Sequence, residues 1–216
     1  MSIYKILLLI HVILGASGLL CGTVVLLSKK GDKKHKKMGK FFLFTMLGAA
    51  LLALGFAALK GNIFLFVVGI FTIYLIGTGA RFIKLKIKDD EVKPTWLDWT
   101  LSTFMLLSGI VFLIYGVNIL IVSKYFGWVL ITFGTIGLSG VWQDFHYYRG
   151  LKKEKMYWLR THISRMTGGY IAAFTAFIVN NMGLSPQGIP GFVFWLLPTV
   201  ILTPLIVKWQ RQYVKK

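Results

Sequence analysis

The sequence predicts an all-α protein, a polytopic bundle of about seven transmembrane helices with its N-terminus outside and its C-terminus in the cytoplasm. Three observations predict this fold: the composition, the spacing of apolar stretches, and the placement of lysine and arginine. The 216-residue chain is 56% hydrophobic and 15% charged, and its mean hydropathy is +0.70. Soluble domains are about 45–50% apolar and about 25% charged. A bilayer accommodates the surplus apolar surface, because lipid is itself an apolar solvent.

Seven stretches are long enough to cross a hydrocarbon core, which takes about 20 mostly apolar residues. They are residues 3–28, 40–60, 62–84, 97–122, 125–146, 158–181 and 190–210. The second and third stretches are separated only by a tight turn at Lys60 and Gly61, and the fourth and fifth by Ser123 and Lys124. Since these connections leave no room for a soluble domain, residues 1–216 are predicted to form a single integral membrane domain.

Basic residues predict the orientation. If seven helices alternate, segments 29–40, 81–93, 149–160 and 208–216 lie on one side with 21 Lys and Arg residues. The other side holds Lys5, Lys60 and Lys124, and Arg165 falls inside a helix. Because Lys and Arg are retained in cytoplasmic connections, the basic side is predicted to be cytoplasmic. The predicted location is the cytoplasmic (inner) membrane of a bacterium.

The net charge of +18 invites comparison with nucleic-acid-binding proteins. The basic residues lie in short runs between apolar stretches, which is the pattern of membrane topology signals rather than of a folded basic surface. The sequence therefore predicts a lipid bilayer, and no nucleic acid, as the partner. Arg165 with the Lys-rich inner rim could bind anionic lipid headgroups; alternatively, the Arg165 side chain snorkels to the interface.

Ionisable groups at membrane depth are costly, and each is a functional hypothesis. The predicted topology brings several of them to the cytoplasmic side, from elements far apart in the sequence: His35, Asp98, Asp144, His146 and His162. Imidazole and carboxylate groups are the usual ligands of zinc and non-haem iron. These five residues are therefore a candidate metal site, in which zinc or iron would serve hydrolysis or redox chemistry.

Structural roles compete with the metal interpretation. Asp98 could act as a helix N-cap or interact with a helix N-terminus, and Asp144 could pair with Arg149 or Arg165. His35 lies among lysines, as a solvated loop residue would, just before the second helix. No HExxH or CxxC spacing supports a metal site.

A haem-b-binding, cytochrome-like protein is the alternative, with His146 and His162 as axial ligands near the inner face. His11 lies alone, about 12 Å below the outer boundary at roughly 1.5 Å per residue. For His11 the sequence favours a hydrogen bond to a neighbouring helix.

Two segments resemble a bacterial family of predicted membrane proteins classed as domain of unknown function 2306. The first runs from His11 through Gly15 to His35 and Gly39, and the second is the segment around His162 and Met166. The resemblance is fairly specific over residues 1–60 and loose over 158–180. It implies that His11, His35 and His162 are a recurring set, and it brings no established activity. The histidines are also similar in style to those of membrane cytochromes of the b561 and ferric-reductase kind.

Three function classes follow from the sequence. The first is a histidine-based metal-binding membrane enzyme or redox protein with its site near the cytoplasmic face. The second is a small-solute transporter, for which Pro198 and Pro204 would break the last helix. The third is a structural subunit of a membrane complex, which small-residue stripes exposed on the lipid side of the first or fifth helix would favour. Whatever the function, the G-x-x-x-G spacing of Gly18 and Gly22 predicts close helix packing.

Overall fold

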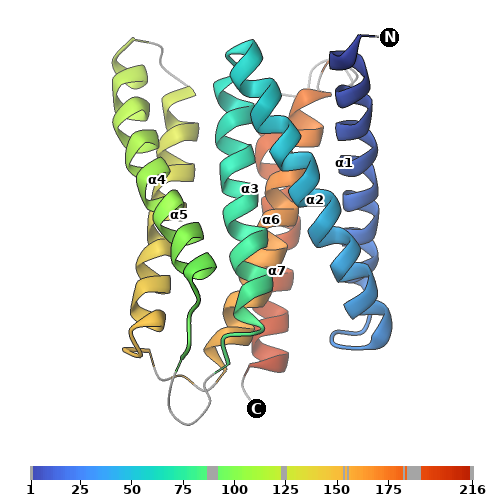
Figure 1. Cartoon of the computed structure of the whole chain (residues 1–216), viewed down its shortest axis with the longest axis vertical. Helices are drawn as coiled ribbons and strands as arrows, with labels where there is room; N and C mark the ends of the chain where they lie inside the picture. The colour runs from blue at the N-terminus through green and yellow to red at the C-terminus, as the bar shows by residue number, and fades with distance from the viewer. Residues whose placement is uncertain are drawn as a thin grey trace. The chain divides into compact units, whose positions relative to one another are not determined.

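Seven helices make up the part of the chain that the structure, a computed structural model, describes: residues 2–86, 92–122, 126–152, 154, 156–181, 183 and 191–214. The helices are α1 (Ile3–Leu27), α2 (Lys33–Lys60), α3 (Ile63–Phe82), α4 (Trp96–Val122), α5 (Phe126–Tyr148), α6 (Tyr157–Asn180) and α7 (Gly191–Tyr213) (Figure 1). No strand is present among these residues. The all-helical prediction is confirmed.

One helix begins well before the apolar stretch that predicted it. Helix α2 starts at Lys33 instead of residue 40, because the Asp32 side chain caps it by accepting the His35 backbone N–H at 2.6 Å. An N-cap carboxylate satisfies one of the donors that a helix start leaves unpaired. His35 therefore lies in the first turn of α2, and its predicted place in a loop before the helix is wrong.

Five of the described helices are long and apolar enough to cross a membrane: α1, α2, α3, α4 and residues Val193–Tyr213 of α7. The chain is thus a membrane-type helical protein. Helices α5 and α6 fall outside this group, and both carry polar residues, such as Asp144 in α5 and Arg165 in α6. That these two helices also cross the bilayer stays a prediction.

By Cα packing, the chain divides into two compact units. That residues 1–216 form a single domain stays a prediction. Unit 1 comprises residues Met1–Gly77 and Ile163–Lys216, and unit 2 comprises residues Thr78–His162. The unit boundaries fall inside α3 and α6. Each unit is described by itself below.

In unit 1, glycines of α1 allow two other helices to approach closely. A Cβ on Gly18 would lie 2.5 Å from the Met46 side chain of α2, and a Cβ on Gly22 would collide with the Tyr170 ring of α6. Tyr170 packs with Phe42 in the buried core of this unit. The predicted role of Gly18 and Gly22 in helix packing is confirmed.

In unit 2, α4 and α5 pack along facing glycines. A Cβ on Gly127 would lie 2.5 Å from the Gly116 carbonyl oxygen, and one on Gly134 would lie 3.0 Å from the Gly109 carbonyl oxygen. A Cβ on Gly137 would meet the Met105 side chain, which is fully buried. Small residues let membrane helices gain packing contacts where no hydrophobic effect drives association.

Within each unit, the basic connections gather at one end. In unit 1 the Lys30 amine lies 4.0 Å above the Trp209 ring, so the α1–α2 turn and the end of α7 are neighbours. In unit 2 the Lys86 amine lies 4.3 Å above the Trp158 ring, so the segment after α3 and the first turn of α6 are neighbours. This arrangement agrees with the predicted alternation of basic connections. Which compartment these ends face stays a prediction.

Replacing Gly22 by alanine is expected to destabilise the protein, because the added methyl collides with the Tyr170 ring. That ring is held by a 2.7 Å hydrogen bond between its hydroxyl and that of Thr23. Overpacking of this kind costs about 1–3 kcal/mol. The measurement is the melting temperature in detergent.

The matched control is Gly15→Ala, in the same helix, where an added Cβ meets nothing within 4 Å. It should leave the melting temperature unchanged or raise it, since alanine has the higher helix propensity. Equal melting temperatures for the two variants would contradict the close α1–α6 approach.

Candidate functional site

The turn between α1 and α2 is built around the carbonyl groups that end α1. Ser28 donates its hydroxyl to the Val24 carbonyl at 2.6 Å. The Lys30 amine donates to the carbonyls of Val25 at 3.1 Å, Leu26 at 2.6 Å and Ser28 at 3.1 Å. A helix leaves its last carbonyls without partners, and a cation there also interacts favourably with the helix dipole. Lys30 therefore has a structural role in this turn.

Burial lowers the pKa of the Lys30 amine below its usual value. The amine lies against the Trp209 ring as well as the three carbonyls, and a desolvated ammonium group loses hydration energy. The cation–π contact and the carbonyls compensate part of this cost. Lys30 is thereby distinguished from the other lysines of segment 29–40, six of which are exposed.

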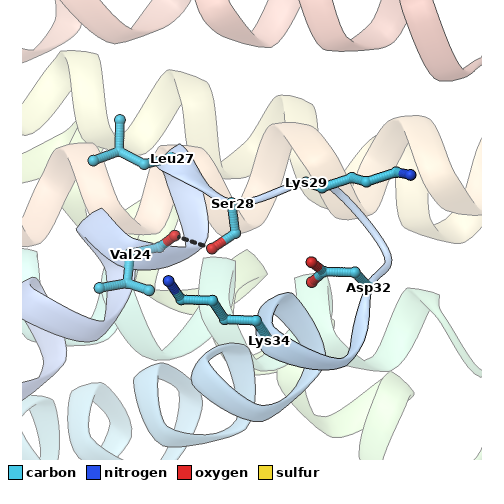
Figure 2. A pocket seen from close by; sticks show the side chains of 6 residues that line it. All are labelled: Val24, Leu27, Ser28, Lys29, Asp32 and Lys34. Carbon is cyan, nitrogen blue, oxygen red and sulfur yellow. Dashed lines mark hydrogen bonds between the residues drawn. The ribbon is translucent and has the colours of Figure 1, made fainter.

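A cleft of about 320 Å³ opens at the same turn. It is lined by Val24, Leu27, Ser28, Lys29, Asp32 and Lys34. In Figure 2 the Lys34 amine and the Asp32 carboxylate are turned toward the Ser28 hydroxyl, and the Lys29 side chain extends away from the others. One wall is apolar, formed by Val24 and Leu27, and the other carries both signs of charge. Such a cleft suits an amphiphilic anion.

A second polar group closes the connection between α3 and α4 in unit 2. Arg81 donates Nε to Asp98 Oδ1 and Nη2 to Asp98 Oδ2, both at 2.7 Å. The Thr95 backbone N–H and hydroxyl also donate to Asp98 Oδ2, at 2.7 and 2.8 Å. The Asp98 carboxylate thus reaches back to the Thr95 backbone N–H, which is one half of a capping box, and the same carboxylate receives a bidentate arginine. Asp98 lies in the first turn of α4, so it interacts with a helix N-terminus, as one of the two structural interpretations expected, and it is not the N-cap residue itself.

Asp144 lies in a second buried group, between α4 and α5. Its Oδ2 accepts the Ser102 hydroxyl at 2.8 Å, and the Ser102 and Tyr148 hydroxyl oxygens are 3.5 Å apart. Asp98, Ser102 and Asp144 are fully buried. Helices α4 and α5 each contribute residues four apart, which lie on one face. The pairing of Asp144 with Arg149 or Arg165 stays a prediction.

His11, His146 and His162 each donate Nδ1–H to a backbone carbonyl, since a carbonyl can only accept. His11 binds the Ala49 carbonyl of α2 at 2.9 Å, as the sequence favoured. His162 binds the Gly79 carbonyl of α3 at 2.8 Å. His146 binds the carbonyl of Trp142, four residues earlier in its own helix, at 2.8 Å. These bonds orient each ring and hold its Nδ1 on the protein backbone.

Arg165 is buried rather than at an interface. Its side chain is 5% exposed, and its guanidinium carbon lies 5.1 Å from the centre of the Tyr74 ring. A snorkelling arginine would reach the lipid–water boundary, so that interpretation is wrong for Arg165. The same burial makes Arg165 a poor contact for a lipid headgroup.

The described side chains do not supply the predicted metal site. Among the described residues, no three His, Cys, Asp or Glu side chains lie close enough together to hold a metal ion. Asp98 is bound by Arg81, and Asp144 accepts from Ser102. The metal hypothesis therefore has no support from these residues.

The sequence analysis missed several residues of the α1–α2 cleft and of the groups around Asp98 and Asp144. The spacing Thr95-x-x-Asp98 before an apolar run is a capping-box signal and could have been recognised. The Arg81 partnership and the Ser102–Asp144 hydrogen bond join residues 17 and 42 positions apart and carry no local signal. Lys29 and Lys34 were counted only among the basic residues of segment 29–40, and Asp32 was not considered.

Comparisons with known proteins add no relative: no protein-family model, no curated protein and no solved structure matches the chain. The resemblance to the domain of unknown function 2306 stays a prediction.

Replacing Arg81 by glutamine is expected to destabilise the protein strongly, because it leaves the fully buried Asp98 carboxylate without its counter-ion. Breaking a buried pair in this way costs about 3–5 kcal/mol. Asp98→Asn should cost less, since Asn still accepts the Thr95 N–H and the Arg81 side chain is 19% exposed. Melting temperatures in detergent rank the variants.

The matched control is Glu154→Gln, which removes an ion pair to Arg160 that is 3.6 Å long and more than half exposed on both sides. Exposed pairs contribute about 0–1 kcal/mol. If Arg81→Gln melts like Glu154→Gln, Asp98 and Arg81 do not form the buried pair.

Proposed function

We propose that this chain is a multi-pass protein of the bacterial cytoplasmic membrane that binds an anionic phospholipid headgroup at the α1–α2 turn. The observation that carries the proposal is the cleft there, which combines the cations Lys29 and Lys34 with the apolar wall of Val24 and Leu27. A lipid presents the matching pair of surfaces, a phosphate next to hydrocarbon.

Charge supports an anionic ligand. Segment 29–40 contains seven lysines and one acid, Asp32. Lys30 is occupied by the end of α1, but Lys29 and Lys34 line the cleft. A lysine near an anionic membrane surface contributes about 1 kcal/mol of attraction. The Ser28 hydroxyl, which donates to Val24, can still accept a hydrogen bond from a ligand or water.

Position supports a lipid rather than a soluble anion. The cleft lies at the end of α1, a helix apolar enough to cross the membrane, and Leu27 is 84% exposed. An exposed leucine beside lysines is expected at the boundary between acyl chains and headgroups. A free phosphate would make no use of this apolar wall.

Lys34→Gln is expected to weaken phosphatidylglycerol binding about 5-fold, because it removes one cation of about 1 kcal/mol from the cleft. Native mass spectrometry of the detergent-purified protein, titrated with phosphatidylglycerol, measures the bound fraction. Lys36→Gln is the matched control, since it removes the same charge from the same segment and does not line the cleft.

Equal weakening by Lys34→Gln and Lys36→Gln would mean that only the overall charge of the segment matters, which would overturn the cleft. Inorganic phosphate is added as a competitor. If millimolar phosphate displaces the lipid completely, the site binds a soluble anion instead of a headgroup.

A second candidate, the haem-b-binding redox protein, is favoured by one observation in unit 2. His146 and His162 each use Nδ1–H on a backbone carbonyl. A carbonyl on one ring nitrogen fixes the orientation of the imidazole, as the outer partners of metal-ligating histidines do. Two axial histidines suffice for haem, so this candidate does not need the larger metal cluster. Bound haem would supply one-electron chemistry.

If the chain binds haem, protein purified from cells grown with iron is expected to show a haem absorbance band. His162→Ala should abolish that band. Elemental analysis of the same sample measures bound iron and zinc. His11→Ala is the control, because His11 lies in unit 1 with its own carbonyl partner. A colourless, iron-free preparation would rule the haem candidate out.

A further inference from the structure

We infer that the cleft selects lipid phosphodiesters whose headgroup carries hydrogen-bond donors, and that Asp32 is the residue that determines this specificity. The inference rests on the proposed function and concerns which headgroup the same cleft accepts. Its ligand class includes the glycerol headgroup of phosphatidylglycerol and excludes the phosphomonoester of phosphatidic acid.

The formal charge of the lining points to a monoanion. Lys34 and Asp32 face the cleft with opposite charges, and Lys29, whose side chain extends outward at the rim, brings the formal charge of the lining to +1. A phosphodiester carries one negative charge and matches it. A phosphomonoester carries about −1.5 to −2 at pH 7 and would face the Asp32 carboxylate with surplus negative charge.

The geometry of Asp32 points to a donor on the ligand. Asp32 Oδ1 accepts the His35 N–H at 2.6 Å, which holds the carboxylate in place. In Figure 2 that carboxylate is turned toward the same space as the Lys34 amine. An ionised carboxylate accepts only, with about four lone-pair positions, so Oδ2 suits a headgroup hydroxyl or ammonium. The phosphate then belongs beside Lys34 and the headgroup terminus beside Asp32.

Apolar residues set the direction of the lipid in the cleft. Val24 and Leu27 line the side formed by α1, and Asp32 precedes α2. Acyl chains would therefore continue along α1, with the phosphate between the apolar wall and the carboxylate. A headgroup without donors, such as phosphocholine, would leave Asp32 facing three methyl groups.

Asp32→Asn tests the specificity without removing the helix cap, because Asn and Asp are comparable N-cap residues. The bound fractions of phosphatidylglycerol, phosphatidic acid and phosphatidylcholine are compared by native mass spectrometry at equal concentration. The natural protein is expected to prefer phosphatidylglycerol to phosphatidic acid by about 10-fold, the ratio that 1.4 kcal/mol would give. Asp32→Asn should reduce that ratio to about 1 by raising phosphatidic acid binding.

The two proposals fail separately. If no phospholipid binds, or if Lys34→Gln changes nothing, the headgroup site itself is absent. If phosphatidylglycerol binds and needs Lys34, but Asp32→Asn leaves the selectivity unchanged, Asp32 does not determine it and only this inference fails. Asp32→Ser, which also caps a helix, must behave like Asp32→Asn, because a difference between them would trace the effect to the cap.

Discussion

Hydrocarbon cannot form hydrogen bonds, and this constraint accounts for most of what the polar side chains of the chain do. Exposed polar residues in the helices bind a carbonyl four positions earlier in the same helix. Thr23 binds the Leu19 carbonyl, Asn118 that of Ile114, and Asn180 that of Ala176. Each such bond gives a side-chain donor a partner that lipid could not provide. Because the carbonyl belongs to the same helix, the bond does not depend on a neighbouring helix. The deeper polar groups instead join different helices.

The buried carboxylates show the same constraint at higher cost. An ionised Asp98 removed from water is tolerable only with close, well-aligned donors, and it receives four from Arg81 and Thr95. This use of Asp98 ties the end of α3 to the start of α4. Because the carboxylate is committed to that role, it is a weak candidate for a metal ligand. Asp144 is likewise engaged, by Ser102.

Lysines at the basic ends serve two purposes. Some are anchors: the amines of Lys30, Lys86 and Lys152 lie over the rings of Trp209, Trp158 and Tyr157. Others, such as Lys29 and Lys34, are exposed and line a cleft. Aromatic rings and long cationic side chains both settle at the membrane interface, where one end meets apolar groups and the other meets water. In the α1–α2 turn, the anchored Lys30 holds the end of α1, and Lys29 and Lys34 are exposed.

The sequence by itself determined the helical fold and the approximate helix limits, because both are recorded as local composition. It placed α1 almost to the residue, but it missed the first turns of α2, since Asp32 starts a helix among lysines that no apolar pattern marks. Only the tertiary structure decided what the ionisable residues contact. How the helices pack decides these partners: Arg81 for Asp98, Ser102 for Asp144, and the Gly79 carbonyl for His162. The partners lie far apart in the sequence, and the residues between them carry no signal of the contact.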